Sequence, residues 1–208
     1  MGTFTSGFRQ AAAAIYKGYF SLPHVRDAAS VCRNYRSIAD APRKTLDLGC
    51  GRTPKNPFEA EQLFGIDVDY GVDEASCILP CDLGVERIPF DDNYFDYVTA
   101  FDLFEHIPRL AYIGTDRRYP FIFLMSECYR VLKPGGYLLS DTPCFPRAAT
   151  YVDPTHVNTI SIDTFPLYFA RPNNWASRYG FEGEFHLSKQ AWCNQNLITL
   201  LQKPFAKV

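Results

Sequence analysis

The chain has 208 residues and a formal net charge of −2, with 47% apolar and 21% charged residues. These values are typical of one soluble globular domain, and they argue against a broad basic surface for nucleic acid. No apolar run reaches the roughly 18 residues of a bilayer span, and the N-terminus lacks the pattern of a cleaved signal peptide. The seven cysteines are scattered. We therefore expect reduced thiols, no structural zinc and a cytoplasmic location.

Residues 1–40 are predicted to form a helical cap over the pocket of the main domain. The alanine run at 11–14 favours a first helix, which Pro23 ends. A second helix is expected over Val25–Tyr35, and Pro42 closes the segment. Residues 41–208 are expected to form the main domain as one compact unit.

Short apolar runs predict five buried strands, at Lys44–Leu48, Leu63–Val68, Ile78–Leu83, Phe95–Phe101 and Tyr137–Asp141. A helix is predicted over Phe121–Leu132, because its apolar residues repeat at helical spacing, and residues 134–136 predict a turn after it. Such alternation is typical of an α/β fold with a parallel sheet and helices on both faces. Segments 181–189 and 196–203 instead predict an antiparallel hairpin at the C-terminal end of the sheet.

The stretch LDLGCGRTP, residues 46–54, places two glycines directly after the first strand. Gly49 and Gly51 allow the backbone to approach a ligand at the carboxyl edge of the sheet. A tight turn without a ligand explains the pair about as well. Dinucleotide-binding loops have a third glycine where this chain has Pro54, so pyrophosphate is not the favoured ligand.

Acidic residues follow the first three predicted strands or end them. Asp67 comes 20 residues after Asp47, the spacing at which a carboxylate meets ribose hydroxyls. Asp82 ends the third strand, where it can accept a hydrogen bond from an adenine amine. Each acid alone reads equally well as a turn residue, but the three in strand order favour a nucleoside-containing ligand.

From Lys44 to Phe145 the chain resembles the class I S-adenosylmethionine (SAM)-dependent methyltransferases. The pieces that carry the resemblance are LDLGCG, GIDVD, CDLGVERIPFDDNYFDYV, FDLFEHIP and ECYRVLKPGGYLLSDTP. The strings PKNPFEAEQLFGIDVD and DPTHVNTIS resemble a bacterial subgroup often found near glycan or secondary-metabolite biosynthesis. The resemblance implies a Rossmann-like sheet of seven strands, SAM as the cofactor and S-adenosylhomocysteine as its product.

The resemblance also implies roles for individual residues. By motif, the methionine part of SAM would lie against Asp47, Gly49, Gly51 and Phe101. The ribose would bind Asp67, with Asp69 as a second candidate. The adenine would bind Asp82 and Leu83. One departure concerns the glycine loop, where Arg52, Thr53 and Pro54 replace the usual third small residue. The course of this loop is therefore left open.

Two clusters of ionisable residues follow the fourth and fifth strands, where an acceptor would bind. In the first, Asp102 and Glu105 are predicted to bind the substrate and His106 to be catalytic. In the second, Asp153 is predicted to orient His156, which would serve as the general base. A helix cap at Asp102 and histidines that merely fix loops are equally good structural interpretations.

Arg118, together with Arg117, is a candidate clamp for an anionic group of the substrate, although a solvated charged pair is the plainer interpretation. The two clusters could also supply an oxygen-rich magnesium site. Spacing alone does not select a metal, so no metal is predicted.

The sequence thus predicts transfer of a methyl group from SAM to a small molecule, in the first place to a hydroxyl of a sugar or related metabolite. N-methylation of a small amine and a non-catalytic cofactor-binding protein of the same fold remain as alternatives. No nucleic acid or membrane is expected as a partner, and the sequence determines neither the acceptor nor the oligomeric state.

Overall fold

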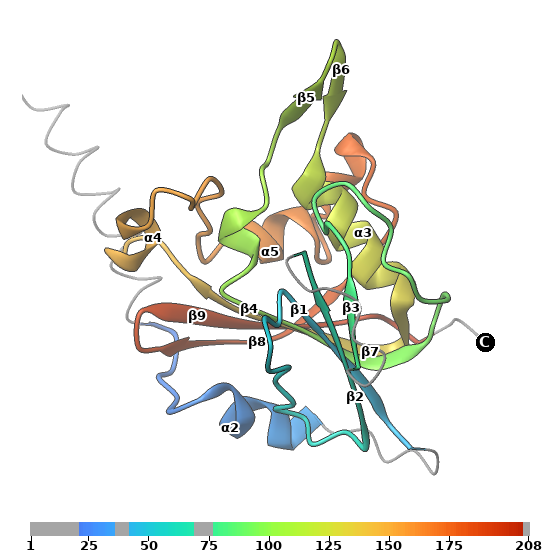
Figure 1. The fold of residues 1–208 in the computed structure, drawn as a ribbon. Helices are drawn as coiled ribbons and strands as arrows, with labels where there is room; N and C mark the ends of the chain where they lie inside the picture. The colour runs from blue at the N-terminus through green and yellow to red at the C-terminus, as the bar shows by residue number, and fades with distance from the viewer. Residues whose placement is uncertain (1–20, 36–41, 69–76, 206–208) are drawn as a thin grey trace, which may run out of the picture.

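The computed structural model describes residues 21–35, 42–68 and 77–205 (Figure 1). Its centre is a seven-stranded sheet in the order β3-β2-β1-β4-β7-β9-β8. The strands are β1 (Lys44–Leu48), β2 (Gln62–Asp67), β3 (Ile78–Pro80), β4 (Phe95–Phe101), β7 (Leu132–Pro143), β8 (His186–Cys193) and β9 (Asn196–Gln202). Pairs from β3 to β7 are parallel, and β9 is antiparallel to β7 and β8. The predicted Rossmann-like sheet with its C-terminal hairpin is confirmed.

Strand boundaries differ from the prediction where the backbone turns. β1 and β4 have the predicted bounds, but β3 ends at Pro80, before the predicted Leu83. The chain turns there because the carbonyl of Asp82 accepts hydrogen bonds from the amides at positions 85 and 86. β7 begins at Leu132 and so takes in residues 134–136, where the sequence predicts a separate turn. Gly135, at φ +84°, supplies the left-handed backbone within that segment.

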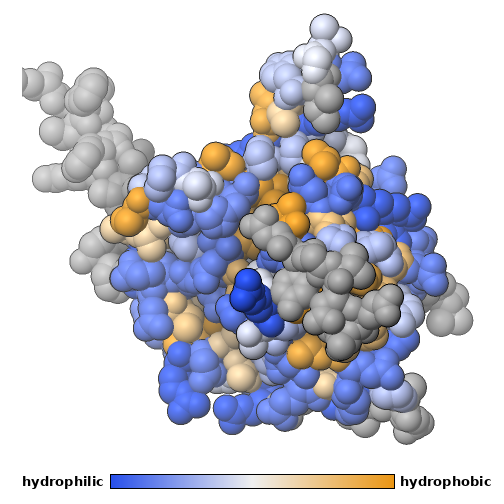
Figure 2. All heavy atoms as spheres, viewed as in Figure 1, coloured by the Kyte–Doolittle hydropathy of each residue, from blue (hydrophilic) through white to orange (hydrophobic). Residues whose placement is uncertain are grey.

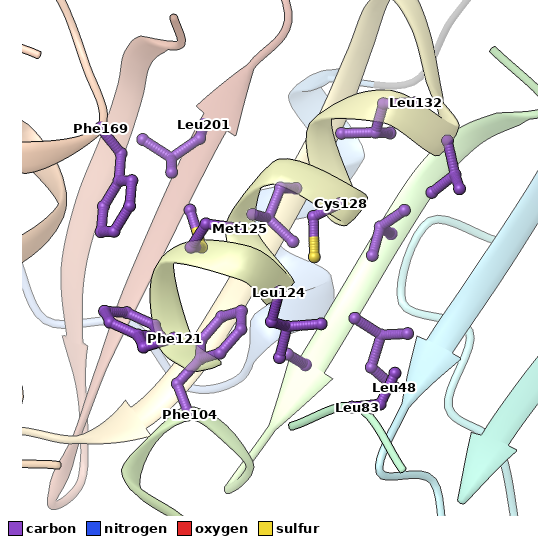
Figure 3. Packing of buried hydrophobic residues seen from close by; sticks show 14 of the residues in the cluster. Leu48, Leu83, Phe104, Phe121, Leu124, Met125, Cys128, Leu132, Phe169 and Leu201 are labelled. Atoms are coloured by element: carbon purple, nitrogen blue, oxygen red, sulfur yellow. The ribbon is translucent and has the colours of Figure 1, made fainter. Parts of the chain in front are cut away.

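Helix α3 (Pro120–Val131) covers one face of the sheet, as its apolar periodicity predicts. Its buried side chains point onto the strands, as Figure 3 shows for Leu124, Met125 and Cys128 beside Leu48 and Leu201. Each large apolar side chain buried here contributes about 1.5–3 kcal/mol to folding. This layer fixes α3 along the face of the central strands, with its C-terminal end beside the start of β4.

The other face of the sheet carries α2 (Ala28–Cys32) and the short helix η1 (Arg33–Tyr35). Alternate strand residues point to opposite faces, so Val98 packs under α3 whereas Tyr97 belongs to the cluster with α2. Backbone hydrogen bonds between residues 23–25 and Trp192 of β8 tie this segment to the sheet. The remainder of the predicted helical cap, residues 1–20 and 36–40, lies outside the described residues.

The crossover from β1 to β2, residues 49–61, contains no helix. Parallel strands usually connect through one. Here the ring of Phe58 instead stacks on that of Tyr97 with centroids 4.0 Å apart, and Asn56 exchanges two hydrogen bonds with Ala60. This extended loop therefore covers the sheet face that a helix would otherwise bury.

Short elements follow the carboxyl ends of β4 and β7. They are η2 (Phe104–His106), β5 (Ala111–Ile113), β6 (Asp116–Arg118), α4 (Ala149–Val152), α5 (Thr164–Tyr168) and η3 (Trp175–Tyr179). The hairpin β5–β6 projects from the body of the molecule (Figure 1). On the face in Figure 2, apolar side chains form small separate patches among hydrophilic ones. None of the helices in the described part of the chain has the length and apolarity of a bilayer span.

Candidate active site

The glycine loop after β1 bends back toward β2. Gly49 and Gly51 have φ values of +63° and +57°, and the amide of Gly51 donates to Oδ2 of Asp67 at 2.8 Å. A Cβ at Gly49 would lie 2.8 Å from Cδ1 of Leu103, whereas a Cβ at Gly51 would meet no atom within 4 Å. Gly49 thus permits close packing, and Gly51 leaves open space at the carboxyl edge, as a bound cofactor needs.

Asp47 lies buried beneath this loop and braces it. The hydroxyl of Thr99 donates to its Oδ1 at 2.7 Å, and the amide of Lys55 donates to its Oδ2 at 2.7 Å. Burial raises the pKa of Asp47 to about 6, against the lowering effect of these two hydrogen bonds. The side chain therefore holds the loop in place, and its contact with the cofactor stays a prediction.

The residues predicted to hold ribose and adenine lie at the ends of β2 and β3. Asp67 is half-buried, and its carbonyl accepts from the amide of Cys81 at 3.3 Å, which brings the end of β3 beside it. Asp82 is exposed, and its Oδ1 accepts from the amide of Gly84 at 2.9 Å. The side chain of Leu83 is buried in the core, so only its backbone is available to a ligand (Figure 3). Asp69 lies outside the described residues.

Two further residues, to which the sequence analysis assigns no role, face this edge. The ammonium of Lys55 lies 4.3 Å from the ring centre of Phe101, at the end of β4, and its charge acts on both Asp47 and Asp141. Asp141 is half-buried, its Oδ1 accepts no hydrogen bond from the described residues, and burial raises its pKa. The sequence signal for this cation beside Asp47 and Asp141 is the lysine that directly follows the stretch 46–54.

Three residues from the two predicted acceptor clusters come together. Glu105 and His106 lie on η2, and His156 lies in the loop after α4. One potential ligand atom from each lies within 4.8 Å of the other two, and the two imidazole rings meet edge to face with centroids 4.8 Å apart. We call these three residues the trio.

Glu105 is the buried member of the trio. Its exposed fraction is 0%, and neither carboxylate oxygen has a hydrogen-bond partner among the described residues. Burial, and the negative charges of Asp102, Asp141 and Asp153, raise its pKa to about 7. A buried carboxyl group without a partner is costly, so it is expected where a ligand completes the site.

Hydrogen bonds outside the trio orient both histidines. The hydroxyl of Thr155 donates to Oδ1 of Asp153 at 2.6 Å, so it accepts from Nδ1–H of His106 at 3.0 Å. The Nδ1–H of His156 donates to the carbonyl of Thr150 at 3.3 Å. In each neutral ring Nε2 is then the nitrogen that carries the lone pair. The sequence predicts that Asp153 orients His156. The Oδ2 of Asp153 lies 4.0 Å from Nε2 of that ring, and the Oδ1 of Asp153 reaches His106 through Thr155. The orienting role of Asp153 stays a prediction.

The remaining predicted substrate residues lie in two different places. Asp102, at φ +50°, accepts at Oδ1 a hydrogen bond of 2.8 Å from the side-chain Nδ2 of Asn196, which ties the end of β4 to the hairpin β8–β9. It does not cap a helix through its side chain, since η2 has no side-chain cap. Arg118 lies on the projecting β6, pairs with Asp116 at 3.8 Å and lines a hollow that also includes Gly84.

A cavity of about 330 Å³ lies beside α5, and hydrogen bonds through Asn158 connect its wall to the backbone of Glu105. Its wall residue Arg109 donates to Oδ1 of Asn158 at 2.5 Å, and the amide of Asn158 donates to the carbonyl of Glu105 at 2.9 Å. The lining combines aromatic rings with hydroxyl and carboxylate groups, namely Tyr119, Phe121, Ser161, Asp163, Thr164, Tyr168, Phe169 and Tyr179. This mixture suits a small molecule with apolar faces and polar substituents.

The strand order, the glycine loop after β1 and the acids that end the next strands define a class I methyltransferase fold. Residues 46–140, from β1 into β7, match the family described as "Methyltransferase domain". The comparison with curated proteins gives no match. Residues 46–140 therefore carry the similarity to SAM-dependent methyltransferases, and the fold is the one that those enzymes share.

Solved structures agree with this fold. A SAM-dependent methyltransferase from Archaeoglobus fulgidus is 17% identical, with a TM-score of 0.53, over 84% of this chain and 92% of that one. One from Mesorhizobium loti is 14% identical, with a TM-score of 0.52, over 85% and 98%. The cyclase SpnF is 15% identical, with a TM-score of 0.55, over 86% and 80%. At such identities the likeness establishes the fold alone.

Proposed function

We propose that this enzyme transfers the methyl group of SAM to a hydroxyl group of a small molecule, a sugar or a related polyhydroxylated metabolite. The observation that carries the proposal is the trio, with its buried Glu105 that lacks a hydrogen-bond partner among the described residues. An oxygen acceptor must lose its proton to become a good nucleophile, and the trio provides the groups that promote this loss. An amine acceptor needs only its neutral lone pair, for which two histidines and a buried acid would be superfluous.

The cofactor site is proposed at the carboxyl edge formed by β1, β2 and β4. The open space at Gly51, the carboxylate of Asp67 beside it and the exposed Asp82 suit the methionine, ribose and adenine parts in turn. Lys55 adds a cation for the methionine carboxylate, over the ring of Phe101. Bound SAM supplies a methyl group on a sulfonium. The sulfur keeps the electrons of the broken carbon–sulfur bond and leaves as a neutral thioether.

The residues of this chain would align the acceptor and handle its proton. The hydroxyl would lie against the trio while the rest of the acceptor enters the cavity lined by Tyr119 and Asp163. Alignment of oxygen, methyl carbon and sulfur supplies much of the rate in such a displacement. Arg118, on the hairpin β5–β6, remains a candidate for an anionic group of a larger acceptor.

The test begins with calorimetric titration of the purified chain with SAM and, separately, with NAD. Binding of SAM alone, in the micromolar range, supports the cofactor site. A screen of sugars, nucleotide sugars and small amines then follows transfer of a labelled methyl group. O-methylated product from wild type, lost in His156→Gln while SAM affinity is kept, supports the acceptor assignment.

Two results of this screen would contradict the proposal. N-methylated product with full activity of His156→Gln would favour the amine alternative. SAM binding without turnover on any acceptor would favour a protein that uses the fold without methyl transfer; the cyclase SpnF, by its name, is a protein of this fold with another reaction.

A further inference from the structure

We propose that Glu105, His106 and His156 bind a divalent transition-metal ion. The trio offers one carboxylate and two imidazole ligands, whose potential ligand atoms lie within 4.8 Å of one another. Ligand atoms about 2.0–2.2 Å from one ion in tetrahedral geometry lie about 3.3–3.6 Å apart, so side-chain movements of about an ångström would complete the site.

The state of Glu105 points independently to a missing ligand. It is fully buried, and both of its oxygens lack hydrogen-bond partners among the described residues. A bound cation would satisfy both oxygens and offset the cost of their burial. Asp102, Asp141 and Asp153 add further negative charge around Glu105, which favours a cation over any neutral ligand.

The hydrogen bonds of the two histidines suit metal binding as well. A ligating histidine usually donates its second ring N–H to a carbonyl or a carboxylate, which fixes the ring and its tautomer. His156 donates from Nδ1 to the carbonyl of Thr150, and His106 donates from Nδ1 to Thr155, which is anchored on Asp153. In both rings Nε2 therefore carries the lone pair that would bind an ion.

The ligand types select the kind of metal. Magnesium and calcium prefer sites made of oxygen alone, whereas imidazole favours zinc, iron, cobalt, nickel or copper. Three protein ligands leave open coordination positions. The catalytic role of the metal rests on the proposed function. An acceptor hydroxyl would bind at an open coordination position and lose its proton to water more readily, because a bound cation lowers the pKa of an oxygen ligand.

The test titrates the full chain, freed of metal with a chelator and kept reduced, with Co²⁺ alone. The cobalt spectrum separates nitrogen and oxygen ligands from thiolates, which matters because free cysteines include the exposed Cys77. Wild type is expected to bind one equivalent without a thiolate band. Glu105→Gln and His156→Gln are expected to bind at least about tenfold more weakly, and Thr155→Val about 10–100-fold more weakly.

A matched control removes the other two histidines of the chain, His24 and His186, both exposed. The double variant His24→Gln/His186→Gln is expected to bind Co²⁺ like wild type. Circular dichroism and thermal unfolding without metal confirm that each variant is folded. Added Co²⁺ is expected to raise the melting temperature of wild type and of the control, but not of Glu105→Gln.

The metal inference is overturned if wild type binds no Co²⁺, if the trio variants bind as wild type does, or if the control loses binding. It fails separately from the proposed function, because the titration uses neither SAM nor acceptor. If the protein binds SAM and methylates a hydroxyl without binding Co²⁺, only the metal inference is contradicted. If the protein binds Co²⁺ at the trio but methylates no acceptor, only the proposed function is contradicted.

Discussion

The ammonium group of Lys55 lies 4.3 Å from the ring centre of Phe101, so the loop after β1 reaches the end of β4. The contact joins two segments that are 46 positions apart in the sequence. The ammonium group places a positive charge at this edge of the sheet, where it interacts electrostatically with Asp47 and Asp141. A cation at this position can recognise the carboxylate of an amino-acid ligand.

Lys55→Met is therefore expected to weaken SAM binding about tenfold, which corresponds to about 1.4 kcal/mol. The side chain keeps most of its apolar length, so the main loss is the charge. Calorimetric titration with SAM measures the effect. Lys44→Met is the matched control, because its ammonium lies 3.6 Å from the ring centre of Tyr94 at the opposite end of β1. Equal SAM affinities for the two variants would contradict the role of Lys55.

Asp67→Ala is expected to lower SAM affinity by more than tenfold. The substitution removes the carboxylate proposed for the ribose and also the acceptor for the amide of Gly51. Asp91→Ala, at an exposed position outside the site, serves as the control and is expected to bind like wild type. Unchanged affinity of the Asp67 variant would sink the ribose assignment, and its melting temperature separates a binding effect from unfolding.

Alanine at the two loop glycines is expected to have different effects. Both positions have positive φ, which costs a residue with a Cβ about 1–2 kcal/mol. Gly49→Ala adds a clash with Leu103 and should mainly lower the free energy of unfolding. Gly51→Ala projects into open space and should mainly weaken SAM binding. Urea unfolding and SAM titration of both variants measure the two effects, and the reverse pattern would place the ligand elsewhere.

The raised pKa of Asp47 predicts a pH dependence of stability. A buried acid with a pKa of about 6, against 3.8 ordinarily, binds its proton more tightly in the folded state. Its contribution to the free energy of unfolding should therefore fall as pH rises from about 4 to about 6, by about 3 kcal/mol in all, and stay constant above.

Urea unfolding of wild type and of Asp47→Asn between pH 4 and pH 7 tests this dependence. The asparagine side chain of the variant does not titrate, so the wild-type free energy of unfolding is expected to decline relative to the variant across this range. The variant loses one acceptor for the amide of Lys55, which shifts its stability by a constant amount at all pH values. Parallel curves for the two proteins would show that Asp47 does not titrate in this range.

Much of the fold could be predicted from the sequence, because its signals are local. Buried parallel strands are apolar runs, and β1 and β4 have the bounds that these runs predict. The apolar repeat of α3 likewise gives its position within one residue at each end. The helix-free crossover from β1 to β2 was not predictable, because it depends on the stacking of Phe58 on Tyr97, a contact made only when the sheet forms.

The sequence by itself determined the class of fold and the residue types near the candidate site, since strand-end acids and a glycine loop follow from chain order. Only the tertiary structure decided which of them meet. It joined Glu105 and His106 to His156 across about 50 positions, and it placed one oxygen of Asp153 on Thr155 and the other 4.0 Å from His156. It also brought Lys55 over Phe101. Such pairings depend on how loops pack after distant strands, and nothing local in the chain encodes them.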